Sequence, residues 1–173
     1  MSSALKYMVV AMGPGEIAQG MAFAKYALSR NARIIFAVLR PEHMGWLGGK
    51  KKKFTPMLIS DSIHLKQKIR RERPDVLVLC NSKVFGWEPD FRTHAPDPKP
   101  YTVSIDSNWL FHPTSPYPSA EWVDRYFINI PAPVFRFGLK RFGGNYVIAP
   151  SYEKKIRVIG LLPSYKRIPR GRV

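Results

Sequence analysis

The stretch that decides the fold runs from Val9 to Leu39 and reads "VVAMGPGEIAQGMAFAKYALSRNARIIFAVL". A short apolar run enters a glycine turn at residues 13–16, and a second, β-branched run occupies residues 33–39. Between the two runs, apolar residues recur at helical spacing. Strand, turn, helix and strand in this order predict a parallel βαβ unit, with the glycine turn at the carboxyl end of its first strand.

The same alternation continues along the chain. Six short apolar runs predict strands, at residues 6–12, 33–39, 56–60, 75–80, 101–106 and 124–130. A second helix follows Asp61 or Ser62, either of which can cap it, and ends before Pro74. Apolar strands separated by helices predict an α/β protein. We expect a Rossmann-like three-layer sandwich with a mostly parallel sheet of about six strands.

Composition sets the class of partner. The 173 residues suit one Rossmann-like domain over residues 1–160, followed by a basic tail at 161–173. Lys and Arg number 28 against 12 Asp and Glu, a formal charge of +16, which favours anionic partners. The single Cys80 excludes an internal disulfide and indicates a reducing compartment. No apolar run approaches the roughly 20 residues of a membrane span, so a cytoplasmic location is expected.

The glycine turn has three interpretations: a dinucleotide site, a sugar site, or only the start of a helix. Ligands of open α/β sheets lie at the carboxyl ends of the strands, which is where this turn is expected. A G-x-G-x-x-G fingerprint would place its third glycine at Ala18, and the second strand is followed by Arg40 rather than by an acidic residue. An NADP-dependent reductase is therefore only the third hypothesis.

Four stretches carry a resemblance to a known family. They are "VVAMGPGEIAQGMAFAKYALSRNARIIFAVL", "KIRRERPDVLVLCNS", "YTVSIDSNWLF" and "FRFGLKRFGGNYVIAPSYEKKIRVIGLLP". Together they resemble the N-terminal, acceptor-binding domain of GT-B fold glycosyltransferases of the peptidoglycan GlcNAc-transferase and diglycosyl-lipid synthase type. In that family a second domain or subunit holds the nucleotide-sugar donor. The resemblance implies a sugar or lipid-linked acceptor, a donor-binding partner, no other cofactor, and no activity of the chain alone.

The resemblance also implies site residues. Relatives commonly place a base in the first glycine loop, and Glu16 is the carboxylate at that position. Asp106 follows the fifth strand, where some relatives hold a supporting acid. Both residues also have a purely structural interpretation, because Glu16 suits the start of a helix and Asp106 suits a turn. The residues expected to bind the acceptor are Gly13, Gly15, His43, Asn81, Ser82, Asn108 and Trp109.

Residues 41–54 are expected to form a mobile acceptor loop. They contain the run Lys50, Lys51, Lys52 and Lys53, preceded by Trp46. We expect this run to attract an anionic membrane, at on the order of 1 kcal/mol per lysine, so that the protein associates with the inner membrane face. The alternative is a solvated loop. No metal site is expected, because the four histidines lack metal-ligand spacing.

Further basic groups at residues 66–73 and 166–172 support a different class of function. Under this alternative the chain is a non-catalytic, basic Rossmann-like module that binds a nucleotide or nucleic acid through phosphate contacts. No known nucleic-acid recognition motif accompanies these groups. Nucleic acid is therefore ranked below a sugar acceptor as a partner.

Overall fold

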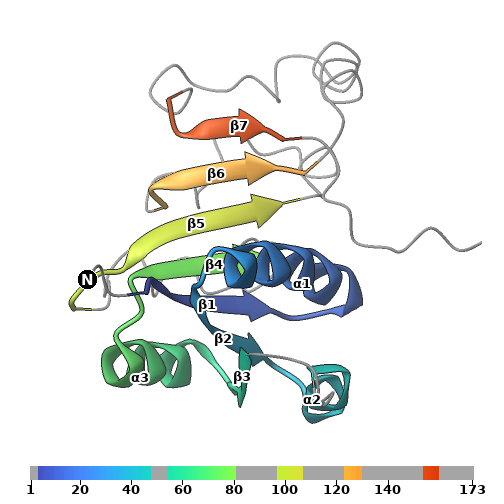
Figure 1. Cartoon of the computed structure of the whole chain (residues 1–173). Coiled ribbons are helices and arrows are strands. Elements are labelled where there is room, and N and C mark those ends of the chain that lie inside the picture. Colours follow the sequence, from blue (N-terminus) through green and yellow to red (C-terminus); the bar gives the residue numbers. More distant parts are fainter. Residues whose placement is uncertain (1–3, 48–53, 81–96, 107–122, 130–153, 160–173) are drawn as a thin grey trace, which may run out of the picture.

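The computed structural model describes residues 4–47, 54–80, 97–106, 123–129 and 154–159 (Figure 1). Its strands form one sheet in the order β3-β2-β1-β4-β5-β6-β7, and every neighbouring pair is parallel. The expected α/β, Rossmann-like fold with a parallel sheet is therefore confirmed. The sheet has one strand more than the sequence predicted, because a short C-terminal segment pairs with β6.

Each of the six predicted strands is present, with bounds that shift by a few residues at most. The strands are β1 (Lys6–Ala11), β2 (Arg33–Val38), β3 (Phe54–Leu58), β4 (Val76–Cys80), β5 (Tyr101–Asp106), β6 (Arg125–Ile128) and β7 (Ile156–Val158). The helices are α1 (Pro14–Ser29), α2 (Pro41–Leu47) and α3 (Ser62–Glu72). The sequence predicts a loop over residues 41–54, but the structure has the short helix α2 at the start of this stretch. Pro41 is the first residue of α2, a position that proline favours.

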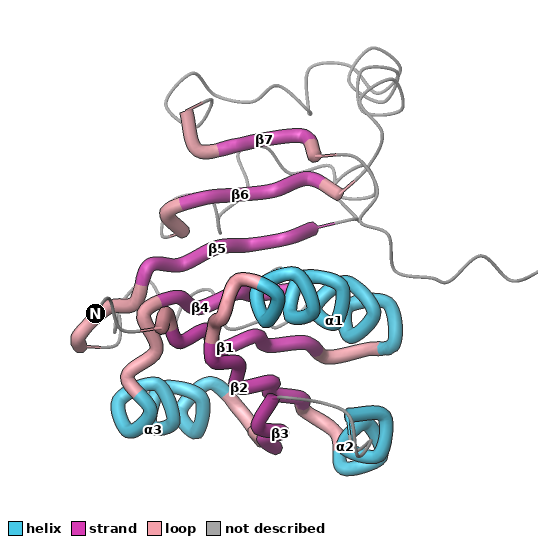
Figure 2. Tube along the Cα trace, viewed as in Figure 1, coloured by secondary structure: helices cyan, strands magenta, loops and turns pink. Residues whose placement is uncertain are grey.

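Two cores lie on the two faces of the sheet. Side chains of β1 alternate between them, with Val9 and Ala11 in the core that α1 covers and Met8 and Val10 in the core that α3 covers. All four residues are fully buried, which explains why this strand is continuously apolar in the sequence. Figure 2 shows α1 running back across the sheet, from the carboxyl ends of the strands toward their amino ends.

The close approach of α1 to the sheet depends on Gly20. A Cβ atom on Gly20 would lie 2.8 Å from Phe36 Cζ and 2.9 Å from Val9 Cγ1. The third glycine position of the G-x-G-x-x-G fingerprint falls at Ala18, two residues before the glycine that makes this close approach. Neither Gly13, with a φ of −116°, nor Gly15 adopts a left-handed conformation, so the turn does not need glycine for its backbone angles.

The helix ends follow local signals in the sequence. Asn31, with a φ of 61°, ends α1: its N–H donates to Leu28 O, and Ala32 N–H donates to Ala27 O. Asp61, one of the two predicted caps of α3, accepts a hydrogen bond of 2.7 Å from His64 N–H. These caps fix the residue at which α1 ends and the residue at which α3 begins.

The order of the strands locates the switch point of the fold. The chain moves outward from β1 to β2 and β3, and then returns through α3 to place β4 on the other side of β1. The connection after β1 therefore leaves the sheet where the winding direction reverses. Open α/β sheets bind ligands at the carboxyl ends of the strands beside such a point.

Candidate functional site

A hollow of about 540 Å³ opens at the carboxyl ends of β1, β2 and β3. Three successive strand-to-helix connections supply its walls. The lining residues are Met12, Gly13, Pro14, Glu16, Leu39, Arg40, His43 and Ser60. Because parallel strands end at a common edge, segments far apart in the sequence meet here, as the sequence predicted for the glycine turn and residues 40–43.

The side chain of Glu16 folds back onto the glycine turn. Gly13 N–H donates to Glu16 Oε2 at 3.1 Å, so the carboxylate satisfies an amide at the start of α1. Pro14, the first residue of the helix, has no N–H to offer. A dinucleotide pyrophosphate needs free amides and no competing negative charge at this place. The arrangement therefore disfavours the dinucleotide interpretation of the turn.

Glu16 also lies close enough to β4 to affect its last residue. Burial raises the pKa of the Cys80 thiol well above its usual value, and the negative charge of Glu16 raises it further. The thiol is fully buried and stays protonated at neutral pH. Cys80 is thus part of the core, and Glu16 is positioned at the switch point between β1 and β4.

His43 is the buried polar residue of the hollow. Its side chain is 5% exposed, and its ring centroid lies 5.0 Å from that of Trp46, which is half-exposed. Its Nδ1 atom is buried without a hydrogen-bond partner among the residues that the structure describes. Leaving such an atom unpaired costs roughly 1–3 kcal/mol. His43 therefore keeps unused hydrogen-bonding capacity at the hollow that it lines.

Ser60 lines the hollow, although the sequence did not predict it as a site residue. Its hydroxyl donates to Asp61 Oδ2 at 2.7 Å and lies 3.2 Å from His64 Nδ1. The backbone N–H of His64 and the Ser60 hydroxyl hold the pKa of Asp61 below its usual value. The available signal was a serine two residues after β3, directly before the helix cap. Its place beside the glycine turn depends on the pairing of strands β1, β2 and β3.

The structure brings together three of the predicted site residues: Gly13, Glu16 and His43. Gly15 is exposed and does not line the hollow. Asp106 is the last residue of β5, two strands from β1 on the side away from β2. The predicted residues outside the described ranges are Asn81, Ser82, Asn108, Trp109, Lys50, Lys51, Lys52 and Lys53.

The fold and the hollow define the class of this protein: an α/β protein with a Rossmann-like, all-parallel sheet and, at its carboxyl edge, a hollow with both polar and apolar walls. The chain matches no protein-family model, and no curated protein matches it significantly. Of the helices within the described ranges, none combines the length and the apolar character needed to cross a bilayer. The function is therefore argued from the hollow itself.

Proposed function

We propose that this chain is the acceptor-binding half of a GT-B fold glycosyltransferase. The hollow at the carboxyl ends of β1, β2 and β3 would receive a hydroxyl-bearing acceptor, and a second domain or subunit would supply the nucleotide sugar. The observation that carries the proposal is His43, which lines that hollow together with Glu16 and is buried with no hydrogen-bond partner for its Nδ1 among the described residues.

The lining suits a sugar better than a phosphate. A sugar hydroxyl both donates and accepts hydrogen bonds, and the walls offer acceptors at Glu16 and Ser60 and a donor at Arg40. Met12 and Leu39 add apolar surface for the C–H groups of a sugar ring. Arg40 already lies 3.7 Å from Glu42, so the hollow has no excess of positive charge for a phosphate.

In the proposed reaction, Glu16 is the base. Its carboxylate would take the proton of the attacking acceptor hydroxyl, whose oxygen forms a bond to the anomeric carbon of the donor sugar. The bond from that carbon to the nucleotide diphosphate breaks, and the diphosphate leaves with the electron pair. The hydrogen bond from Gly13 N–H holds Glu16 Oε2 in place and so orients the carboxylate. The supporting role of Asp106 remains a prediction.

Membrane association through Lys50 to Lys53 belongs to the same proposal. Trp46, in α2 just ahead of this run, is 51% exposed, and an indole at such a position suits the interface of a bilayer. A lipid-linked acceptor would then reach the hollow from the membrane surface. Vesicle binding tests this point separately from sugar binding.

Saturation-transfer NMR on the full chain tests the proposal directly. The probes are a panel of monosaccharides and disaccharides, with NADP as the competing ligand class. We expect at least one saccharide to bind, His43→Ala to abolish its signal, and His43→Asn, which keeps a polar atom near the Nδ1 position, to retain part of it. Glu16→Gln removes the charge of the carboxylate in the lining. Its matched control is Glu42→Gln, which changes an exposed carboxylate outside the lining. A saturation-transfer signal from NADP, together with no signal from any saccharide, would refute the proposal.

A further inference from the structure

The amino edge of the sheet, opposite the candidate site, carries two adjoining hollows of about 340 and 650 Å³. Both are lined by Asn31 and Ala32, the turn that joins α1 to β2. The smaller hollow is aromatic and the larger one is cationic. Neither of them shares a lining residue with the proposed acceptor site.

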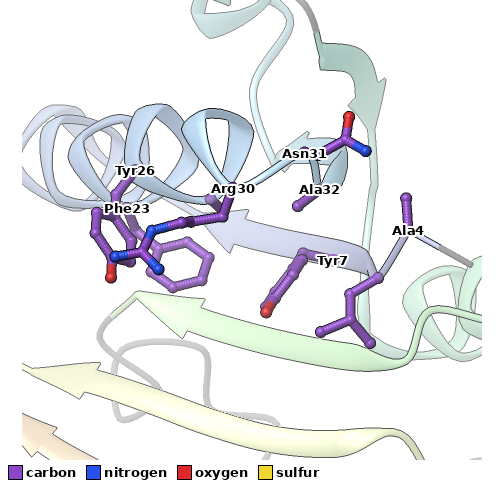
Figure 3. Close-up of a pocket in the computed structure, with 9 residues that line it drawn as sticks. Ala4, Tyr7, Phe23, Tyr26, Arg30, Asn31 and Ala32 are labelled. Carbon is purple, nitrogen blue, oxygen red and sulfur yellow. The ribbon is translucent and has the colours of Figure 1, made fainter. Parts of the chain in front are cut away.

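The smaller hollow presents aromatic rings from two elements (Figure 3). Tyr7 of β1 and Phe23 of α1 meet edge to face, with ring centroids 5.5 Å apart. Tyr26 is 60% exposed, and the Arg30 guanidinium lies 5.3 Å from the centroid of its ring. A flat, aromatic ligand group fits walls of this kind, with Arg30 adding a positive charge at the site.

The larger hollow is lined by four cations and one acid: Lys6, Arg33, Lys68, Arg71 and Glu72. The carboxylate of Glu72 lies 3.1 Å from Lys6 Nζ and 2.8 Å from a guanidinium nitrogen of Arg71, and these two neighbours hold its pKa below the usual value. Arg33 and Lys68 form no ion pair with any acidic side chain in the described ranges. The hollow therefore keeps a net positive charge that its own acid does not cancel.

We propose that the two hollows form one binding site for single-stranded nucleic acid. A base would stack in the aromatic hollow at Tyr26, and the backbone would cross the Asn31–Ala32 turn and place phosphates against Arg33 and Lys68. Proteins bind single strands without sequence preference by this pairing of aromatic platforms and cationic grooves. The inference is independent of the proposed glycosyltransferase function.

Two simpler explanations account for only part of the surface. Arg30 and Arg71 follow or occupy the last turns of helices, where cations stabilise the helix dipole. Arg33, however, begins a strand, and Lys68 precedes the last turn of α3. An anionic bilayer is attracted by protruding side chains, whereas these groups line concave surfaces that a flat membrane cannot enter. A flexible strand can follow them.

Fluorescence anisotropy of short labelled oligothymidylate and oligouridylate, measured over a salt series with the full chain, tests the site. Arg33→Ala/Lys68→Ala is expected to weaken binding and to reduce the slope of log K against log salt by roughly 0.7 for each phosphate that the protein no longer neutralises. Tyr26→Ala is expected to weaken binding about fivefold or more without changing the slope, and Tyr26→Phe to restore it. Lys25→Ala/Arg70→Ala removes the same charge from exposed positions outside both hollows and outside the acceptor site, and is the matched control.

The outcomes distinguish a nucleic-acid strand from a mononucleotide or a lipid headgroup as the source of the bound phosphate. Thermal melting of each variant establishes that it is folded. The proposal fails if the control double variant loses as much oligonucleotide affinity as Arg33→Ala/Lys68→Ala, or if Tyr26→Ala has no effect. It also fails if thymidine monophosphate binds as tightly as the oligonucleotide. It fails likewise if Arg33→Ala/Lys68→Ala lowers binding to phosphatidylglycerol vesicles but not to the oligonucleotide. None of these readouts depends on saccharide binding, so the proposed acceptor site stands or falls separately.

Discussion

Replacing Gly20 by alanine should destabilise the protein, although alanine is the better helix former. The new Cβ would lie 2.8 Å from Phe36 Cζ, 2.9 Å from Val9 Cγ1 and 3.2 Å from Cys80 Sγ. Ordinary carbon–carbon contacts are about 3.5–4.0 Å, so α1 or the strands must shift. Val9 and Phe36 are register partners in β1 and β2 and are both fully buried, so neither side chain can move aside cheaply.

The magnitude follows from two opposing effects. Overpacking of this kind costs about 1–3 kcal/mol. Higher helix propensity returns about 1 kcal/mol. We therefore expect a net loss of up to about 2 kcal/mol in the free energy of unfolding, and a difference of about 1–3 kcal/mol from a helix glycine replaced without overpacking. For a chain of this size, the net loss corresponds to a fall of up to about 8 °C in Tm.

Gly15→Ala is the matched control, because it makes the same chemical change five residues earlier in the same helix. Its Cβ would meet no atom within 4 Å. We expect Gly15→Ala to be neutral or slightly stabilising. Urea denaturation and thermal melting of both variants measure the difference. A Gly20→Ala protein as stable as Gly15→Ala would show that α1 does not approach the sheet as closely as the structure has it, and would refute the reasoning.

Three further predictions concern the site, the membrane and pH. Glu16→Gln should abolish sugar transfer in an enzyme reconstituted with its donor-binding partner, while circular dichroism shows an intact fold, because the amide oxygen can still accept the Gly13 N–H; full activity would remove Glu16 as the base. Replacement of Lys50 to Lys53 by alanine should lower co-sedimentation with anionic vesicles and leave Tm unchanged; unchanged co-sedimentation would contradict membrane docking by this run. The pKa of Glu72 is lowered from its ordinary value of 4.5 by Arg71 and Lys6, so its stabilising effect is present above about pH 4.5 and is lost as the pH falls through the folded-state pKa. Glu72→Gln should therefore lower stability at pH 7 and flatten the acid limb of a urea-denaturation series, and an unchanged acid limb would count against the bridge to Lys6.

The candidate site could be predicted only in part, because some of its signals are local and others are not. The glycine turn and residues 40–43 follow strands that the apolar pattern reveals, so their place at the carboxyl edge follows from the parallel βαβ order. His43 was a candidate by position, but its burial, and the lack of a partner for its Nδ1 among the described residues, depend on the helix that Pro41 begins. Ser60 was missed because its neighbours in the hollow are distant in the sequence.

By itself, the sequence determined the alternation of strands and helices, the α/β class, a helix cap at Asp61 or Ser62, and the basic charge of +16. Hydrophobic period, turn chemistry and charge act over a few residues, so they can be seen in a linear chain. Only the tertiary structure decided that Gly20 rather than Ala18 makes the close approach, that three connections enclose one hollow, and that Arg33 and Lys68 share another. These facts depend on which strands pair and how closely the helices pack, and both are set by the free energy of the whole core rather than by any single segment.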